Sequence, residues 1–286
     1  MGLDPRASLP PPGTVLGGRY RLTRLVAEGG MGAVFEAHDE QAGRSVALKL
    51  LQPELSADRD VRRRFRRESS VLTALDHPNI VQVLDIGAGG AGDDEQLFSV
   101  MELLAGETLA ERLAREGSLT PAALLPILEE IAAGLGAAHE HGVIHGDLKP
   151  ANVFLVAPAG TVKLLDFGLS KILGLERLTR TGELIGTPAY MAPELLTGKG
   201  ELDERIDTYA LGVMTYECLA GRPPFSGNVP GKLMMAIVMG QATPLGELAP
   251  ALSADVTEVV MAAMSRDRER RFHSARALAR AFRDAR

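Results

Sequence analysis

The segment His145–Asn152 and the triplet Asp166-Phe167-Gly168 constrain the fold of this chain more than any other stretch. Two short apolar runs lie between them, at Val153–Val156 and Thr161–Leu165. The segment that joins these runs, Ala157–Gly160, contains proline and glycine, as turns do. Two apolar runs separated by a turn predict a β-hairpin with polar residues at its open end.

The open end of this hairpin carries groups that suit a particular chemistry. Antiparallel pairing brings the residue before the first strand and the residue after the second to the same end of the ladder. Asn152 and Asp166 should therefore meet, with Asp147 just upstream. Two oxygen donors of this kind suit a hard divalent cation such as Mg²⁺, which takes further ligands from water and substrate phosphates. A carboxylate beside them can orient a hydroxyl and accept its proton, so the pattern predicts phosphoryl transfer.

Composition narrows the class of protein. A chain of 286 residues is long enough for one large domain or two small lobes with a real core. The net charge of −6 argues against general nucleic-acid binding. The single cysteine, Cys218, excludes an intramolecular disulfide and a cysteine-based metal site, which fits a reducing cytosol. We therefore expect a cytoplasmic protein, or the cytoplasmic domain of a longer membrane protein.

Targeting and membrane segments are not expected in the chain. No uninterrupted apolar run reaches the ~18–20 residues that a membrane span needs. The segment Met1–Gly13 is rich in proline and lacks the apolar core of a signal peptide, so residues 1–13 are predicted to form a disordered leader.

The pattern of apolar residues changes along the chain. The first third is predicted to form strands at Arg19–Ala27, Ala33–Asp39, Ser45–Leu51, Val83–Ile86 and Gln96–Glu102, interrupted by one helix from after Ser56 to about Leu75. The remainder is predicted to form helices at Pro121–His141, Asp207–Ala220, Leu233–Met239, Ala254–Met264 and Ser274–Arg286. This predicts an α+β fold with two lobes, 14–102 and 103–286, that join near Leu103–Gly106.

A glycine cluster, Glu28–Val34, lies between the first two predicted strands. Glycine lets a backbone approach phosphate oxygens closely and point its N–H groups at them. An ordinary glycine hairpin is an equally good interpretation of the cluster alone. A dinucleotide-binding turn is disfavoured, because a strand and not a helix follows.

Lys49 and Glu68 are the predicted ion pair of the first lobe. Lys49 lies in an apolar strand, where a lysine more often extends to solvent. Glu68, however, falls on the apolar stripe of the predicted helix, which is formed by Val61, Phe65, Leu72 and Leu75. A carboxylate on a buried face is costly unless a cation meets it, and Lys49 is the natural candidate.

Two other clusters have simple structural interpretations. Arg62, Arg63, Arg64, Arg66 and Arg67 are predicted to form a solvated helix face, which is more probable than a nucleic-acid patch in an acidic protein. His141 and His145 lack a third ligand nearby, so a zinc site is disfavoured.

In their order and spacing, these motifs resemble the catalytic loop and the metal-binding Asp-Phe-Gly segment of the protein kinase family. The resemblance runs from about Gly18 to the C-terminus. The form Asp-Leu-Lys-Pro-x-Asn resembles serine/threonine kinases, and the chain as a whole resembles the bacterial eukaryotic-like group. This implies a bilobal kinase fold, with an antiparallel sheet and one helix in the N-lobe and a mainly helical C-lobe.

The resemblance also implies an activity: transfer of the γ-phosphate of ATP to Ser/Thr hydroxyls of proteins, with Mg²⁺ and with Mn²⁺ as an alternative. It assigns Asp147 to orienting the acceptor hydroxyl and accepting its proton. Lys149 would neutralise charge on the transferred phosphoryl group. Asn152 and Asp166 would hold the metal. Protein substrates are the implied partners, and neither nucleic acid nor a membrane is expected.

Nucleotide binding is implied for a larger set of positions. Lys49 resembles the lysine that contacts the α- and β-phosphates and pairs with Glu68 in active kinases. Met101 matches the residue at the back of the adenine pocket, and Glu102 and Leu104 match hinge positions. Ala27 is a departure, since the family has a glycine there. The remaining positions are Val26, Glu28, Gly29, Gly30, Met31, Gly32, Ala33, Val34, Ala47 and Phe154.

Several matches lie far from the catalytic loop. Gly186–Glu194 resembles the substrate-docking loop, and Arg271 matches the distant arginine that pairs with Glu194. Asp207 matches the aspartate that anchors the backbone of the catalytic loop. In this family His145 packs under Phe167.

One departure concerns regulation. The family usually has an arginine before the catalytic aspartate, where this chain has Gly146. That arginine helps to bind a phosphorylated activation loop. Thr179 and Thr181 still match autophosphorylated threonines of bacterial relatives, so our hypothesis is that they are phosphorylated without being a required switch.

Two alternative functions remain to be compared. Antibiotic-phosphorylating enzymes also carry His-Gly-Asp, but they lack the segment ending in Ala-Pro-Glu and the Asp207 and Arg271 pattern. A pseudokinase scaffold typically loses one of three residues that this chain keeps, Lys49, Asp147 or Asp166.

Overall fold

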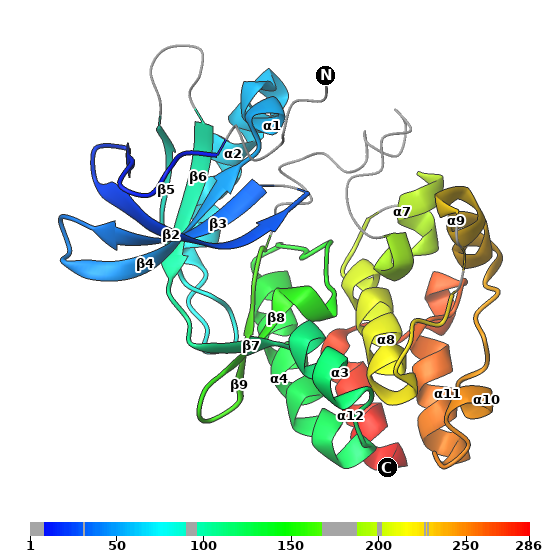
Figure 1. Cartoon of the computed structure of the whole chain (residues 1–286). Coiled ribbons are helices and arrows are strands. Elements are labelled where there is room, and N and C mark those ends of the chain that lie inside the picture. Colours follow the sequence, from blue (N-terminus) through cyan, green and yellow to red (C-terminus); the bar gives the residue numbers. More distant parts are fainter. Residues whose placement is uncertain are drawn as a thin grey trace. The chain divides into compact units, whose positions relative to one another are not determined.

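The computed structural model describes residues 9–30, 32–89, 96–167, 188–198, 202–225, 227 and 229–286, with the backbone alone at residues 66–70. Its contacts divide the chain into two compact units. Unit 1 comprises Met1–Asp76 and Val81–Leu104, and unit 2 comprises His77–Ile80 and Ala105–Arg286. Figure 1 labels most of the helices and strands of both units.

Unit 1 contains a six-stranded antiparallel sheet in the order β1-β2-β3-β4-β6-β5. The strands are β1 (Val15–Leu16), β2 (Tyr20–Gly29), β3 (Gly32–Asp39), β4 (Arg44–Leu51), β5 (Val83–Gly89) and β6 (Gln96–Glu102). The five predicted strands are therefore confirmed, each with small shifts at its ends. The short strand β1, with two residues, was not predicted because it is too short to show an alternating pattern.

The helix predicted from after Ser56 to about Leu75 is α2 (Arg59–Ala74), and a short helix that was not predicted, α1 (Pro53–Ala57), precedes it. Asp58 separates them with extended backbone, at φ −71° and ψ 119°. Its carboxylate accepts hydrogen bonds from the N–H groups of Asp60 and Val61, which caps the start of α2. The predicted helix is therefore confirmed with its start shifted by two residues, because Asp58 is the N-cap residue and not part of the helix.

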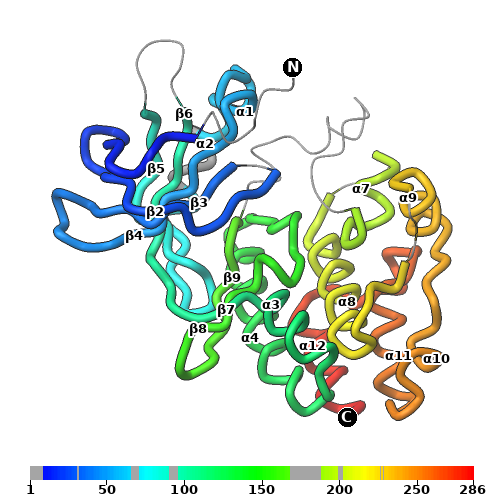
Figure 2. The backbone as a smooth tube through the Cα atoms, viewed as in Figure 1, coloured from blue at the N-terminus to red at the C-terminus, as the bar shows by residue number. Residues whose placement is uncertain are grey.

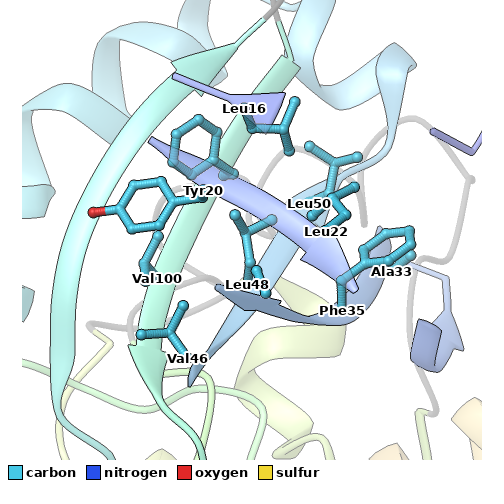
Figure 3. Packing of buried hydrophobic residues seen from close by; sticks show 11 residues of the cluster. Leu16, Tyr20, Leu22, Ala33, Phe35, Val46, Leu48, Leu50 and Val100 are labelled. Carbon is cyan, nitrogen blue, oxygen red and sulfur yellow. The ribbon is translucent and has the colours of Figure 1, made fainter. Parts of the chain in front are cut away.

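One face of the sheet carries the core of unit 1 (Figure 3). Side chains alternate between the two faces of a strand, and directly paired residues share a face. Phe35 pairs with Leu48, and Leu48 pairs with Val100. The buried cluster consists of Leu16, Tyr20, Leu22, Ala33, Phe35, Ala37, Val46, Leu48, Leu50, Phe98 and Val100. The residues that alternate with these along each strand therefore lie on the opposite face of the sheet.

Unit 2 is mainly helical and holds a small three-stranded sheet in the order β7-β8-β9. Its elements are β7 (Gly106–Thr108), α3 (Leu109–Glu116), α4 (Pro121–Glu140), η3 (Pro150–Asn152), β8 (Val153–Val156), β9 (Thr161–Leu164), η4 (Pro188–Tyr190), α7 (Pro193–Thr197), α8 (Arg205–Ala220), α9 (Pro230–Met239), α10 (Leu245–Leu248), α11 (Ala254–Ala263), η5 (Arg268–Arg270) and α12 (Ala275–Ala285). All five predicted helices are confirmed, with boundaries shifted by at most three residues.

Two helices form the centre of unit 2. Nearly all of α8 is buried, and α4 packs against α12, β9 and α8. Figure 2 shows α12, at the red end of the chain, running beside α4. Among the described helices, α4 alone is long and apolar enough to cross a membrane by length and composition, with a mean hydropathy of 1.3. Half of that stretch is buried in the unit, as expected of a core helix.

The short segment His77–Ile80 belongs to unit 2 because of its hydrogen bonds. Asn79 Nδ2 donates to Glu130 Oε2 at 2.8 Å and to the Val162 carbonyl at 3.0 Å. The Asn79 carbonyl accepts from Leu164 N–H at 2.9 Å. Glu130 Oε2 also accepts from Val162 N–H at 2.7 Å. Asn79 therefore ties the segment after α2 to both α4 and β9.

Candidate active site

The β8–β9 hairpin has the predicted form. Its strands pair antiparallel from Val153 with Leu164 to Val156 with Thr161. Beyond the last pair, Leu165 N–H donates to the Asn152 carbonyl at 2.9 Å. The backbone at Asn152 therefore lies beside the residue that precedes Asp166, as the hairpin prediction requires.

Asp147, Lys149 and Asn152 contact one another. Lys149 Nζ donates to Asp147 Oδ2 at 2.6 Å. Asn152 Nδ2 donates to the Asp147 carbonyl at 2.7 Å and to Asp147 Oδ2 at 3.2 Å. The Asp147 side chain keeps 13 % of its surface exposed and that of Lys149 keeps 21 %. The carboxylate is thus held from two sides and still accessible.

Asp166 has an unusual backbone. Its φ of 60° makes it the one non-glycine residue with positive φ in the described part of the chain. A left-handed backbone costs a residue with a Cβ about 1–2 kcal/mol. Such strain is typical of functional sites, where the surrounding structure holds it in place. Asp166 follows directly on β9, so its backbone turns away from the strand at the open end of the hairpin.

The donors at this end fit a hard divalent cation. The amide nitrogen of Asn152 is used by Asp147, which leaves the amide oxygen as its candidate ligand atom. Asp166 supplies a carboxylate, so both candidate ligand atoms are oxygens, as Mg²⁺ prefers. No group of three His, Cys, Asp or Glu in the described residues could hold a metal ion by itself. A metal here would need additional ligands, such as phosphate oxygens.

Asp207, at the start of α8, anchors the catalytic loop. It accepts hydrogen bonds from His145 N–H at 2.8 Å, from Gly146 N–H at 2.8 Å and from His139 Nε2 at 2.7 Å. Asp207 is fully buried. Burial opposes its ionisation, yet the hydrogen bonds and the charges of the neighbouring histidines hold the pKa of this carboxyl below its usual range. The predicted anchoring role of Asp207 is confirmed.

His145 connects the catalytic loop to the segment after β9. Its ring lies 4.6 Å from that of Phe167, between centroids, which confirms the predicted packing. Its Nε2 donates to the Leu165 carbonyl at 2.9 Å. His141, the other histidine of the disfavoured zinc pair, donates from Nδ1 to the Ala137 carbonyl. Both histidines therefore use a ring nitrogen to bond backbone.

The predicted pair of Glu194 and Arg271 is also confirmed. Two parallel hydrogen bonds of 2.7 and 2.8 Å join the guanidinium to the carboxylate, and both groups are buried. The Arg271 guanidinium also lies 4.8 Å from the centre of the Tyr209 ring. The pair ties η5 and the start of α7 to α8.

Four of the predicted nucleotide-binding residues of unit 1 share the sheet face opposite to the core, whereas a fifth, Ala33, belongs to the core cluster. Val34 pairs with Lys49, and Ala47 pairs with Met101. Lys49 is only 6 % exposed, and Ala47 and Met101 are buried too. The alternation that places the core cluster on one face therefore places these four residues on the other.

The β2–β3 turn carries the glycine cluster. Glu28 pairs with Ala33, and Gly29 pairs with Gly32. Gly32 has a φ of 148°, and a Cβ there would lie 2.0 Å from the Leu50 carbonyl oxygen, so only glycine fits.

The remaining predicted nucleotide-binding residues lie partly in unit 1 and partly in unit 2. Ala27 pairs with Val34, and Val26 lies half-exposed in β2 beside a bulge. Gly30 lies in the β2–β3 turn, Glu102 ends β6 and Leu104 ends unit 1. Phe154 lies in β8 of unit 2, paired with Lys163. The residues that fall outside the described part are Met31, the side chain of Glu68, Gly168, Gly186, Thr187, Thr179 and Thr181.

Sequence reasoning missed two polar side chains near the catalytic loop. His139 bonds Asp207, and its position in the last turn of α4 was a usable signal. Glu217 accepts a hydrogen bond of 2.5 Å from the Tyr190 hydroxyl. No sequence spacing or periodicity connects Tyr190 with Glu217, so their contact could be found only in the three-dimensional structure.

Comparison with known proteins agrees with this geometry. The family model described as "Protein kinase domain" matches residues 20–282. The chain is 37 % identical to the serine/threonine-protein kinase pkn2 of Myxococcus xanthus, over 96 % of this chain and 33 % of that protein. It is 39 % identical to PknA of Mycobacterium tuberculosis, over 92 % and 60 % respectively. The chain thus spans between one third and three fifths of these curated relatives.

A solved structure shows the same likeness in three dimensions. The crystal structure of the Mycobacterium tuberculosis PknI kinase domain is 30 % identical, with a TM-score of 0.78 over 97 % of this chain and all of that one. Protein kinase domains in general use ATP and a divalent metal ion. The chain therefore belongs to the protein kinase family and is a serine/threonine protein kinase domain.

Proposed function

We propose that this chain transfers the γ-phosphate of ATP to Ser or Thr hydroxyls of proteins by means of Asp147, Lys149 and Asn152. The observation that carries the proposal is the contact of all three side chains at the open end of the hairpin. Asp147 is accessible and held at one oxygen, which suits a group that orients a hydroxyl.

Each of these side chains has a proposed role in the transfer. Asp147 accepts the proton of the acceptor hydroxyl as the new P–O bond forms, and the bond from the γ-phosphorus to the bridging oxygen breaks, which releases ADP. Lys149, whose ammonium lies 2.6 Å from Asp147, neutralises charge on the transferred group. Such transition states are loose, so positioning and electrostatics supply most of the rate.

Asn152 and Asp166 are the proposed ligands of the metal, which we take to be Mg²⁺, with Mn²⁺ as the alternative. When bound, the ion would neutralise the phosphate oxygens of the nucleotide. The φ of 60° at Asp166 and the bonds of the Asn152 amide nitrogen support these assignments.

The face of the unit 1 sheet that bears Val34, Ala47, Lys49 and Met101 is the proposed contact surface for the nucleotide. Its burial and the glycine turn at Gly32 support this role. The contribution of Glu68 to an ion pair with Lys49 stays a prediction from the resemblance.

We also propose that Thr179 and Thr181 are autophosphorylated without being a required switch. The support is Gly146, which has no side chain to hold a loop phosphate and instead donates its N–H to Asp207. A Thr179→Ala/Thr181→Ala double variant should keep most of its activity toward an added substrate. Loss of nearly all activity would contradict the proposal.

Phosphate incorporation from labelled ATP tests the proposed function directly. Wild type should label itself and a casein-type acceptor, whereas Asp147→Asn should label neither. Asp255→Asn, which makes the same change on the exposed face of α11, is the matched control and should behave as wild type. Nucleotide binding without label in wild type would instead favour a pseudokinase scaffold, and label in a small-molecule acceptor alone would favour the antibiotic-type alternative.

The cellular compartment of the protein is proposed from its cysteine content. The one cysteine, Cys218, is buried and unpaired, which supports a cytoplasmic domain. The leader at residues 1–13 and the boundary between lobes near residues 102–103 remain predictions.

A further inference from the structure

His139, in the last turn of α4, lies between two carboxylates at the start of α8. Its Nε2 donates to Asp207 Oδ2 at 2.7 Å, and its Nδ1 lies 3.7 Å from Glu204 Oε2. The His139 side chain is only 5 % exposed, whereas that of Glu204 is 44 % exposed. A buried imidazole thus faces one fully buried carboxylate and one that reaches solvent.

The second carboxylate matters because of the number of protons that an imidazole carries. A neutral ring has one N–H, so it donates to one carboxylate and turns a lone pair toward the other. While the hydrogen bond to Asp207 is kept, that lone pair belongs to Nδ1 and faces Glu204. A protonated ring donates from both nitrogens, and its charge attracts both carboxylates. The surroundings are therefore complementary to the charged form of His139.

His145 also acts on Asp207 by its charge, but its hydrogen bonds are those of a neutral ring. Its Nε2 donates to the Leu165 carbonyl at 2.9 Å, and its Nδ1 accepts from Asp147 N–H at 3.3 Å. The ring thus uses a proton on one nitrogen and a lone pair on the other. Protonation of His145 would break the bond from Asp147, so of these two histidines His139 is the better source of positive charge.

Asp207 is the group that needs this charge. It is fully buried, and a buried carboxylate is costly unless a cation compensates it. Its two oxygens accept from His145 N–H and from Gly146 N–H, both at 2.8 Å. These two residues directly precede Asp147, so the ionised form of Asp207 fixes the backbone at that residue. A proton on His139 compensates the charge that holds the loop.

The next charged side chains form a pair of their own. Glu140, which follows His139 on α4, bonds Arg276 of α12 at 2.7 Å, and both side chains are more than half exposed. Arg276 also lies against the backbone of α4 at Gly136. The two charges cancel and are screened by solvent, so the two carboxylates of α8 and His145 determine the charge balance at His139.

We propose that His139 is a positioning residue of the catalytic loop that acts in its charged form, held between Asp207 and Glu204. The inference rests on the proposed kinase function. The added proton lies on Nδ1, beside Glu204, and Nε2–H keeps its bond to Asp207. When this proton leaves to solvent, Asp207 loses its counter-charge and holds the N–H groups before Asp147 less firmly. The rate of phosphate transfer then falls, whereas KM for ATP stays the same.

Two measurements on the intact chain test this inference over the same interval, between about pH 5.5 and pH 9, where histidines change charge. Ring ¹⁵N spectra follow the protonation of His139, with His139→Gln to assign its signals. Steady-state kinetics on a serine peptide give kcat. We expect kcat to fall by about tenfold as pH rises, as for loss of a charge-assisted hydrogen bond. The midpoint of this fall should coincide with that of the His139 titration.

Three variants separate the charge of His139 from its bond to Asp207. Glu204→Gln removes the second carboxylate and should move both midpoints to lower pH together. His139→Gln keeps a donor toward Asp207 without the charge, so kcat should be low at the acid end of the interval and should not fall further as pH rises. Glu140→Gln, the same change one residue along α4 from His139, is the matched control for Glu204→Gln and should keep the wild-type profile.

The backbone amide signals of His145 and Gly146 separate this proposal from the kinase function, because they need no phosphate transfer. Both should shift with the midpoint of the His139 titration, even if the chain proved inactive. Signals that do not respond to that titration would overturn the proposal. So would a kcat profile in wild type that does not follow the His139 titration, or midpoints in Glu204→Gln equal to those of wild type. Active enzyme with any of these results would leave the kinase function intact.

Discussion

At the scale of single residues, the site depends on polar groups that hold backbone in place. Asp207 illustrates this, because its buried carboxylate fixes the N–H groups of His145 and Gly146 directly before Asp147. The anchoring role of Asp207 could be predicted from the sequence only through the resemblance to protein kinases. Its three partners come from α4 and the catalytic loop, and no local pattern shows that contact.

Tyr209 gives a first test at this scale. Its ring lies under the Arg271 guanidinium, but its hydroxyl is buried without a hydrogen-bond partner among the described residues. Tyr209→Phe keeps the ring and removes the unsatisfied hydroxyl, so the free energy of unfolding should stay the same or rise by up to about 1–2 kcal/mol. Urea denaturation measures it.

The control for this prediction lies on the same helix. The Tyr216 hydroxyl donates to the Thr243 carbonyl at 2.8 Å, so Tyr216→Phe should lower the free energy of unfolding by about 1 kcal/mol. A larger loss in Tyr209→Phe than in Tyr216→Phe would show that the Tyr209 hydroxyl has a partner after all.

Gly146 gives a second test. Its φ of 74° lies in the left-handed region, where a Cβ causes strain. Gly146→Ala should therefore lower the free energy of unfolding by about 1 kcal/mol. Gly231→Ala, in α9 with open space around the new methyl group, should raise it by about 0.5–1 kcal/mol. Thermal melts of both variants check the two opposite signs; a stabilising Gly146→Ala would refute the strain argument.

At the scale of elements, alternating and helical patterns predicted most of the fold. The prediction of the β8–β9 hairpin was correct because a turn with proline and glycine separates two short apolar runs. The patterns missed the short helix α1 and placed the start of α2 two residues too early, because Asp58 between the two helices is an N-cap residue. They also could not show that His77–Ile80 bonds to α4 and β9, because its partners are distant in sequence.

The segment His77–Ile80 is testable through Asn79. Asn79→Ala removes both hydrogen bonds of the side-chain amide and leaves the buried Val162 carbonyl and Glu130 without that partner. The free energy of unfolding should fall by about 1–3 kcal/mol. Gln241→Ala, which removes an exposed amide after α9, should change it by less than about 0.5 kcal/mol. Equal effects of the two substitutions would mean that the Asn79 bonds add nothing.

At the scale of the whole molecule, acid should weaken both units. Hydrogen bonds from Arg19 hold the pKa of Asp39 in unit 1 far below its usual value of 3.8. In unit 2, hydrogen bonds and histidine charges overcome burial and lower the pKa of Asp207. A carboxylate with a lowered pKa stabilises the folded state above its unfolded pKa and loses this effect as pH falls through the folded one.

The melting temperature should therefore fall steeply below about pH 4. Asp39→Asn should flatten this decline by removing one of the two contributions. Circular dichroism melts between about pH 7 and pH 3 check the prediction, and a decline as steep in Asp39→Asn as in wild type would count against it.

The sequence predicted two lobes and nearly every residue of the catalytic loop, because these residues form one continuous motif. It could not predict the cavity beside Lys149, whose wall combines residues from segments about 100 positions apart. The sequence motifs therefore predict the candidate active site, whereas the neighbouring cavity is found only in the three-dimensional structure.

The most direct test of the central claim is a steady-state comparison of Asp147→Asn with wild type on a serine peptide. If Asp147 acts in the transfer itself, kcat should fall by about 10²–10⁴-fold. The KM values for ATP and peptide should stay within about threefold of wild type, because transition-state interactions affect kcat alone. A kcat near that of wild type would contradict the account, as would a loss confined to KM.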